Sequence, residues 1–203
     1  MPLDSLLAEK LQGGVQQSAT LSEPAEQYTT TAIVLHWATA ALIVANLVLG
    51  LSMVPLPLSP RKLQWYQWHK WIGVTVFLLT VARLAWRWGH PAPVAVPMPL
   101  WQRNAATASH AMLYVLLLMI PLSGWVYSSA TGIQVVYLGL VPLPDLVAKD
   151  RSLATVLRGT HLTLNFLLFV LIVIHAAAAL KHHFGARDTV LVRMLPFARR
   201  AER

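Results

Sequence analysis

The chain of 203 residues suits one compact domain or one small membrane bundle, and its 56% hydrophobic and only 12% charged residues exclude an ordinary soluble fold. It contains no cysteine, which excludes disulfides, cysteine-ligated zinc, iron–sulfur clusters and covalently attached haem. The formal net charge is +8, but the basic residues form no stripe like that of a nucleic-acid-binding domain. Nucleic acid is therefore not an expected partner.

Residues 1–27 open the chain with a polar stretch of mixed charge. A cleavable signal peptide would begin with a basic region and a short apolar core, and this stretch has neither. We interpret residues 1–27 as a flexible tail that precedes the first membrane span.

Long uncharged apolar segments then alternate with proline-rich or charged connections. A helix needs about 20 apolar residues to cross the hydrocarbon core of a bilayer. The apolar segments predict four such helices, near residues 31–53, 66–88, 107–129 and 158–181. The predicted fold class is therefore all-α integral membrane, a four-helix transmembrane bundle.

The connections predict the orientation of the bundle, because Lys and Arg collect in short loops on the cytoplasmic side. The two tails and the second connection together carry ten basic residues, whereas the first and third connections carry six. Both termini are therefore expected in the cytoplasm, including a basic C-terminal tail of residues 198–203. The third connection, about residues 130–157, is the longest and is expected to cover the outer face of the bundle.

Histidines within the spans are the residues most suited to chemistry, because an ionisable side chain in a membrane is costly and is usually functional. A single histidine there is commonly a packing residue, but five in four helices need another explanation. His175 follows His161 by 14 residues, nearly four turns and roughly 21 Å, so both project from one face at opposite sides of the membrane. The five are His36, His69, His110, His161 and His175.

Their depths predict two layers of imidazoles: His36 lies at the depth of His175, and His69 at the depth of His161. Two bis-histidine haems require such layers, because each iron binds one nitrogen from above and one from below. Two stacked haems would carry electrons across the hydrocarbon. His110 shares the layer of His36 and His175, so one of these three is spare and would bind a haem propionate or help to form a quinone site.

The 14-residue interval recurs at Gly50 after His36, at Gly124 after His110, and at Arg83 after His69. The glycines are expected where a missing side chain lets the backbone approach a flat macrocycle, although membrane helices are rich in glycine for other reasons. Arg83 is expected to pair with haem propionates; the alternative is that it extends to the lipid headgroups.

Lys70, next to His69, is predicted to steer a small anion to the outer haem. The alternative is that the outer basic residues only bind phospholipid headgroups.

Four stretches resemble the bacterial cytochrome b561 family, which is similar to the cytochrome b subunit of nickel hydrogenases. The resemblance covers about residues 28–197 and implies a four-helix domain with two haem b groups in the bacterial inner membrane. It implies His36 with His175 as the ligands on the cytoplasmic side, and His69 with His161 on the periplasmic side. The stretches are residues 35–37 (LHW), 69–73 (HKWIG) with Arg83 downstream, 175–184 (HAAAALKHHF) and 188–196 (DTVLVRMLP).

The best-studied activity of that family is oxidation of superoxide at the periplasmic face, with electrons passed to ubiquinone. The leading hypothesis is therefore a di-haem oxidoreductase that carries electrons between a small periplasmic donor, such as superoxide, and a quinone. The alternative is a haem-bearing membrane anchor of a dehydrogenase or hydrogenase complex, with apolar residues 135–141 as its docking surface. A third hypothesis, a histidine-lined transporter of metal ions or protons, predicts no haem.

Overall fold

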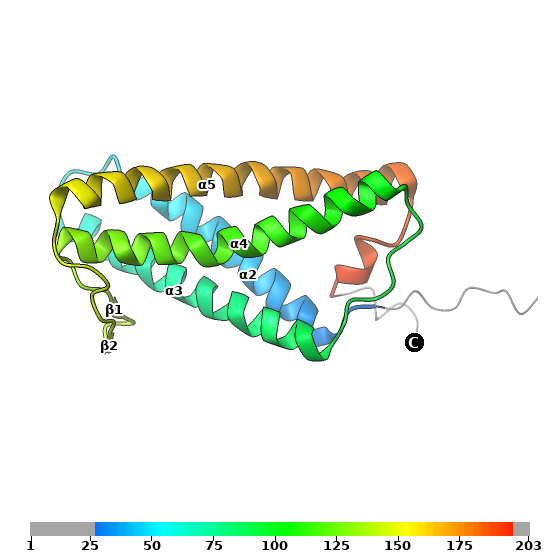
Figure 1. Ribbon diagram of the computed structural model, residues 1–203, viewed down its shortest axis with the longest axis horizontal. Helices are drawn as coiled ribbons and strands as arrows, with labels where there is room; N and C mark the ends of the chain where they lie inside the picture. Colours follow the sequence, from blue (N-terminus) through cyan, green and yellow to red (C-terminus); the bar gives the residue numbers. More distant parts are fainter. Residues whose placement is uncertain (1–26, 197–203) are drawn as a thin grey trace, which may run out of the picture.

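The computed structural model describes residues 27–196, which form four long helices running lengthwise beside one another (Figure 1). All four are long and apolar enough to cross a membrane, which confirms the predicted bundle. The predicted tails lie outside the described residues, except for Gln27. The helices are α2 (Thr30–Met53), α3 (Pro60–Gly89), α4 (Leu100–Thr131) and α5 (Arg151–Leu180).

Three of the helices begin six or seven residues before the predicted spans, because their first turns lie outside the long apolar runs. Side chains cap the first turns of α3 and α5, whereas α4 follows Pro99 without a side-chain cap. At α3, the Ser59 side chain accepts a hydrogen bond from the Lys62 amide, and Pro60 occupies the first turn. At α5, Asp150 accepts hydrogen bonds from the hydroxyl and amide of Ser152 and from the amide of Leu153. These bonds, the Ser152 hydroxyl first, lower the pKa of Asp150.

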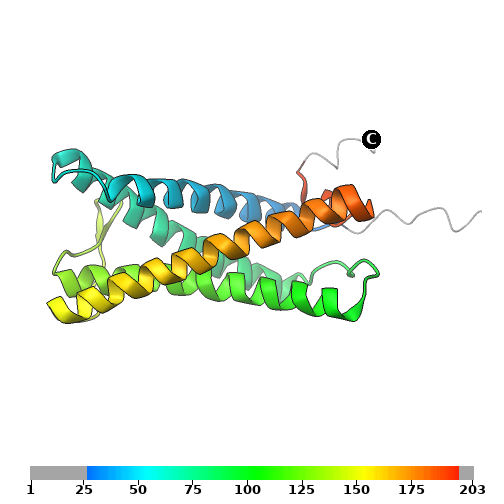
Figure 2. The ribbon, with the colours of Figure 1, turned by 90° about the horizontal axis from the view of Figure 1, so that it is seen from above.

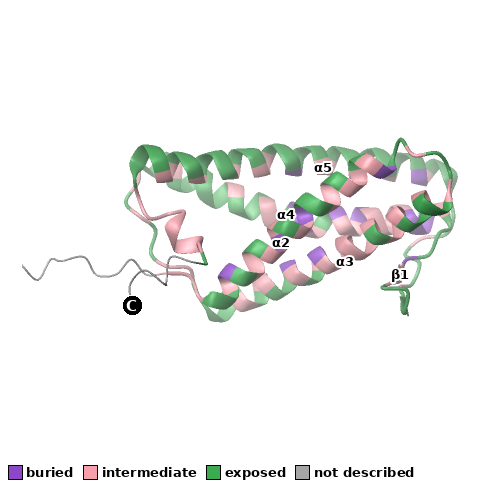
Figure 3. Ribbon diagram, turned by 180° about the vertical axis from the view of Figure 1, so that it is seen from behind, coloured by how far each residue is buried: buried purple, intermediate pink, exposed green. Residues whose placement is uncertain are grey.

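The buried core of the bundle is small and combines an apolar cluster with buried hydroxyl residues such as Thr39 and Thr80. Large apolar side chains cover the outside as well, including Leu51 at 78% exposure and Phe166 at 65%. Figure 3 shows the same division, with buried positions between the helices and exposed ones facing outward. This surface is what a bundle dissolved in lipid requires. The central buried cluster consists of Ile43, Val76, Leu116, Leu117, Ile120 and Leu168.

One end of the bundle carries a short hairpin, and we call it the hairpin end (Figure 1). Strands β1 (Val136–Tyr137) and β2 (Val141–Pro142) pair in antiparallel fashion around Leu138 and Gly139, both with positive φ. The hairpin packs against α3, where the Trp71 indole donates to the Val136 carbonyl at 2.7 Å. The sequence analysis did not predict this hairpin.

The opposite end, where residues 27 and 196 lie, is the tail end (Figure 2). After α5 the chain forms a π-helix (Lys181–Ala186) and a 3-10 helix (Val192–Met194). We call residues 188–196 the strap, because they fold back across this end. The Trp37 indole donates to the Met194 carbonyl at 2.7 Å, and the Arg193 guanidinium donates to the Val94 carbonyl at 2.6 Å.

An ion pair fixes the start of the strap. Nδ1 of His182 lies 2.5 Å from a carboxylate oxygen of Asp188. Partial burial opposes ionisation of Asp188, but hydrogen bonds from His182 and from the Val190 amide outweigh it and lower the pKa of Asp188.

Candidate functional site

Histidines from three helices meet in two places inside the bundle. Near the hairpin end, His69 of α3 and His161 of α5 face each other with ring centres 6.2 Å apart and planes at 82°. Near the tail end, His36 of α2 and His175 of α5 face each other at 6.3 Å and 66°. We call these the hairpin-end pair and the tail-end pair. Figure 2 shows why α5 serves both: it runs diagonally, from α4 at the hairpin end toward α2 at the tail end.

The spacing in both pairs fits two imidazoles on opposite sides of one metal ion. A metal–nitrogen bond to imidazole is about 2.0–2.1 Å and the ring centre lies roughly 1.1 Å beyond the nitrogen, so the ring centres would be about 6.2–6.4 Å apart. Within residues 27–196 no group of three or more His, Asp or Glu side chains is placed to hold an ion. Each pair therefore fits a metal whose other ligands come from a macrocycle, as in a bis-histidine haem.

A glycine of the preceding helix lies against each imidazole of the hairpin-end pair. A Cβ built on Gly50 would lie 3.3 Å from Cε1 of His69, and one built on Gly124 would lie 3.1 Å from Cε1 of His161. Both distances are shorter than ordinary van der Waals contact, so a side chain at either position would displace the ring. The sequence analysis associated these glycines with a macrocycle, and the structure places the imidazoles themselves against them.

The two rings of this pair differ in what surrounds Nδ1. Nδ1 of His161 lies 2.9 Å from the Ser123 hydroxyl oxygen, which is 2.7 Å from the Ile120 carbonyl oxygen. Because a carbonyl only accepts, the Ser123 hydroxyl donates to Ile120 and His161 Nδ1–H donates to Ser123, leaving Nε2 bare for a metal. Nδ1 of His69 is buried without a hydrogen bond of good geometry, next to the backbone of Asn46.

The tail-end pair has a third imidazole and an arginine beside it. The ring centre of His110 lies 5.4 Å from that of His175, closer than the metal-sharing distance that His36 keeps. By spacing, His110 is thus the spare histidine of this layer. Arg83 is close enough to interact electrostatically with all three rings, and its guanidinium carbon lies 5.5 Å from the centre of the Tyr114 ring. This position suits the predicted contact with a propionate.

Lys70 contacts the third connection and is also close enough to His69 to interact with it electrostatically. Its ammonium nitrogen lies 3.5 Å from the Ile133 carbonyl oxygen, and its charge interacts with Asp145. Both partners belong to the third connection, so the geometry links Lys70 to that connection more directly than to the imidazoles. Its predicted role in steering an anion stays a prediction.

Sequence reasoning missed two groups that the structure brings to these sites. Ser123 lies 38 residues before His161, and its only signal in the sequence is that it precedes Gly124. Trp86 and His90 lie near the tail-end pair and stack with ring centres 3.9 Å apart. The contact of Ser123 with His161 depends on how α4 and α5 cross, which a single sequence does not reveal. The stacking of Trp86 and His90 is local, since the two residues are four apart at the end of α3.

A four-helix membrane bundle with opposed imidazole pairs defines a class, the membrane-bound b-type cytochromes. The profile of one family, described as prokaryotic cytochrome b561, matches residues 27–197. The chain belongs to this family of b-type haem electron-transfer proteins of bacterial membranes.

Individual relatives agree with this assignment. The chain is 34% identical over 177 residues to cytochrome b561 homolog 2 of Escherichia coli, covering 84% of this chain and 92% of that protein. It is 30% identical over 175 residues to cytochrome b561 homolog 1 of Escherichia coli, covering 84% and 97%. It is also 28% identical over 177 residues to a Yersinia pestis protein named "Probable superoxide oxidase CybB", covering 84% and 97%.

Proposed function

We propose that this protein is a di-haem b-type cytochrome that moves electrons between a periplasmic donor and a quinone. The observation that carries the proposal is the pair of opposed imidazole contacts at 6.2 and 6.3 Å, held by three helices near the two ends of one bundle. The two positions on α5 are 14 residues apart, roughly 21 Å along the helix axis. Two one-electron centres at this separation make a route through most of the hydrocarbon.

The residues have separate roles in this proposal. His69 and His161 hold the periplasmic-side haem, and His36 and His175 hold the cytoplasmic-side haem. When bound, haem iron supplies reversible one-electron chemistry, and its potential depends on ligands, hydrogen bonds and burial. Gly50 and Gly124 leave room for the hairpin-end imidazoles, and Ser123 orients one of them. Arg83 and His110 offer donors to the propionates on the cytoplasmic side.

The direction of electron flow follows from the orientation and from one relative. Both termini are proposed to lie in the cytoplasm, which puts the hairpin end at the periplasm of the inner membrane. The name of the Yersinia pestis relative supports superoxide as the donor. Superoxide would give one electron and leave as dioxygen, and two such electrons with two protons would convert a quinone, ubiquinone in the first instance, to the quinol.

The decisive test uses the purified, detergent-extracted protein. A reduced-minus-oxidised spectrum should show b-type haem, with two haems per chain by pyridine haemochrome assay. Adding an enzymatic superoxide source and a soluble quinone analogue should produce quinol faster than a control without protein. A rate equal to that control would eliminate superoxide as the donor, and a colourless, folded protein would eliminate the haem proposal itself in favour of a transporter.

A specific surface supports a second candidate, a haem-bearing anchor for a dehydrogenase or hydrogenase subunit. Of the apolar residues 135–141, Val135 is buried, whereas Leu138 and Leu140 are 52% and 80% exposed. They lie between the two strands of the hairpin, which projects from the bundle (Figure 1) and is where a donor protein would dock. Gentle purification from the native membrane should then recover a soluble redox subunit in a fixed ratio, and recovery of the cytochrome alone would favour the self-contained enzyme.

A further inference from the structure

Two stretches that are far apart in the sequence hold the hairpin-end imidazoles in the same way. In each, the helix that precedes the ligand's own helix carries a glycine against the ring, with a backbone carbonyl four residues earlier. His69 meets this arrangement on α2, and His161 meets it on α4. The corresponding positions are Asn46 and Ile120 for the carbonyl, Gly50 and Gly124 for the glycine, and Leu49 and Ser123 for the residue before the glycine.

The same edge of each imidazole faces its glycine. A Cβ on Gly50 would lie 3.3 Å from Cε1 and 3.6 Å from Nδ1 of His69. A Cβ on Gly124 would lie 3.1 Å and 3.5 Å from the same two atoms of His161. In an α-helix a carbonyl points toward the residue four positions later. Because glycine has no Cβ, the Nδ1 edge of the ring can approach that carbonyl oxygen beside it.

Backbone carbonyls act as hydrogen-bond acceptors toward both rings. The carbonyl of Asn46 interacts with His69, and the carbonyl of Ile120 interacts with His161. The side-chain amide of Asn46 lies against α3 instead, with Nδ2 3.9 Å from the position of a Cβ on Gly73. Because a carbonyl only accepts, these contacts favour the hydrogen on Nδ1 and leave Nε2 bare for iron.

A hydroxyl is the main difference between the two arrangements. The Ser123 hydroxyl oxygen lies 2.9 Å from Nδ1 of His161 and 2.7 Å from the Ile120 carbonyl oxygen. Leu49 stands at the corresponding position on α2, and Nδ1 of His69 is buried without a hydrogen bond of good geometry. His161 therefore has a hydroxyl and a carbonyl beside Nδ1, whereas His69 has the carbonyl alone.

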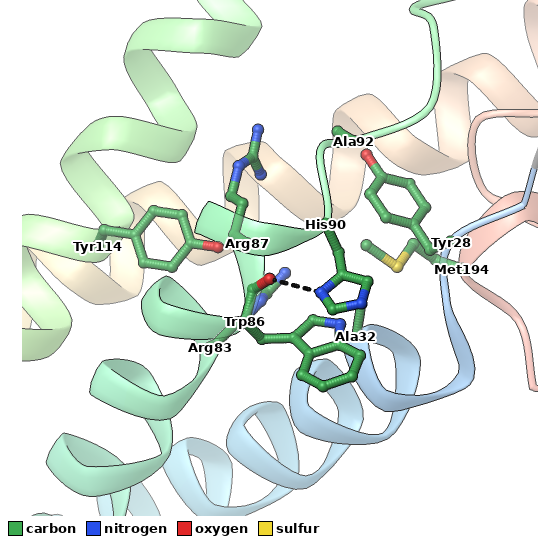
Figure 4. A pocket seen from close by; sticks show the side chains of 9 residues that line it. All are labelled: Tyr28, Ala32, Arg83, Trp86, Arg87, His90, Ala92, Tyr114 and Met194. Carbon is green, nitrogen blue, oxygen red and sulfur yellow. Dashed lines mark hydrogen bonds between the residues drawn. The ribbon is translucent and has the colours of Figure 1, made fainter.

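Side chains, rather than glycine backbone, surround the tail-end pair. Arg83 interacts electrostatically with the imidazoles of His36 and His175. Arg83 and His90 also line a small cavity at this end of the bundle (Figure 4). Both glycine contacts belong to the hairpin-end pair, so a change in them should affect one haem and spare the other.

We infer that Gly50 and Gly124 leave openings through which the carbonyls of Asn46 and Ile120 accept hydrogen bonds from the iron-binding imidazoles; this inference rests on the proposed function. These bonds fix the direction of each ring and make its Nε2 a stronger electron donor. Stronger donation stabilises ferric over ferrous iron, which lowers the reduction potential of the hairpin-end haem. Asn46 and Ile120 are positioning residues that act through backbone atoms, which is why their side chains can differ.

The variant L49S tests this inference, because it gives α2 the hydroxyl that α4 already has. The new hydroxyl should donate to the Asn46 carbonyl and accept from Nδ1 of His69, as the Ser123 hydroxyl does beside His161. The matched control is V48S, since Val48 is 59% exposed on the outside of the bundle.

A redox titration followed by the absorption spectrum measures the two haems of each variant. L49S should lower the potential of the hairpin-end haem and leave that of the tail-end haem unchanged. Ferric haem should also leave the hairpin-end site about tenfold more slowly, the lower limit for contacts that support a metal ligand. V48S should match the unchanged protein in both measurements.

The variant S123A makes the opposite change on α4. It should raise the potential of the same haem, because Nδ1 of His161 loses its hydroxyl partner. The double variant L49S/S123A should have a potential between those of the two single variants. Damaged packing would weaken the site in every variant and would not produce shifts of opposite sign.

Several results would overturn the inference: an unchanged potential in L49S, an equal shift in V48S, or a shift at the tail-end haem. If L49S fails to assemble, S123A decides alone, and a lowered or unchanged potential in S123A overturns the inference. Absence of haem from the unchanged protein would instead eliminate the proposed function and this inference together. The two failures are therefore distinguishable.

Discussion

The two imidazole pairs have nearly the same spacing but very different surroundings. The glycine backbone lies directly against the rings of the hairpin-end pair, with Gly50 beside His69 and Gly124 beside His161. The Ser123 hydroxyl accepts a hydrogen bond from one of these rings. The tail-end pair is accompanied by the charge of Arg83 and by a third imidazole, that of His110. Close backbone contacts therefore distinguish the first pair, whereas charged and polar groups surround the second.

Removing a ligand should have the largest effect and should separate the two sites. H161A is expected to abolish the hairpin-end haem, lowering the haem content by about half and removing one spectral component. H110A should keep both haems, because His110 lies outside the metal-sharing spacing. Haem-to-protein ratios and low-temperature spectra measure both effects. Full haem content in H161A would mean that the pairing is wrong.

Adding a methyl group beside the hairpin-end rings should have the second-largest effect on haem binding. G124A would place a Cβ 3.1 Å from Cε1 of His161, and we expect haem binding at that site to weaken by about 1–3 kcal/mol through overpacking. G50A, at 3.3 Å from His69, should have a smaller effect. The control is G159A, because a Cβ on Gly159 meets no atom within 4 Å. Haem loss during titration with apomyoglobin gives the ranking, and an equal effect of G159A would contradict the steric explanation.

Loss of the Ser123 hydroxyl should cost less. S123A removes the acceptor from His161 Nδ1, and loss of such supporting contacts typically weakens metal binding by 10- to 100-fold. We expect about tenfold, the lower limit of that range, because the Ile120 carbonyl remains near the same nitrogen. The same titration, with a redox titration of each haem, should show the change only at the hairpin end.

The smallest effect should be on the strap. The pKa of Asp188 is lower in the folded protein than in the unfolded chain, so ionised Asp188 stabilises the strap. This stabilisation is complete above about pH 4, the ordinary pKa of an aspartate, and is lost as the pH falls through the pKa of Asp188 in the folded protein. The contribution should be at most about 1 kcal/mol, since both partners are partly exposed. Limited proteolysis near residue 190 should therefore speed up at low pH. In D188N the rate should be higher and independent of pH.

The spans and the histidine layers are the parts of this protein that its sequence predicts well. The length of an apolar segment indicates directly whether it can cross a membrane, because nearly every residue in a span is surrounded by hydrocarbon or by another helix. The 14-residue interval between His161 and His175 gives both depth and face, because helix geometry is regular. Depth alone does not separate His36 from His110 as the partner of His175. The crossing of α5 from α4 toward α2 separates them, because it places the ring of His175 6.3 Å from that of His36 and 5.4 Å from that of His110.

By itself the sequence determined a four-span membrane bundle with imidazoles at two depths, because periodicity and apolar length act along one helix at a time. Tertiary structure alone decided the spacing of the paired rings, that Gly50 and Gly124 contact imidazoles, that Ser123 reaches His161, and that His90 lines a cavity. These features arise between helices, whose crossing angles come from the packing of many side chains together.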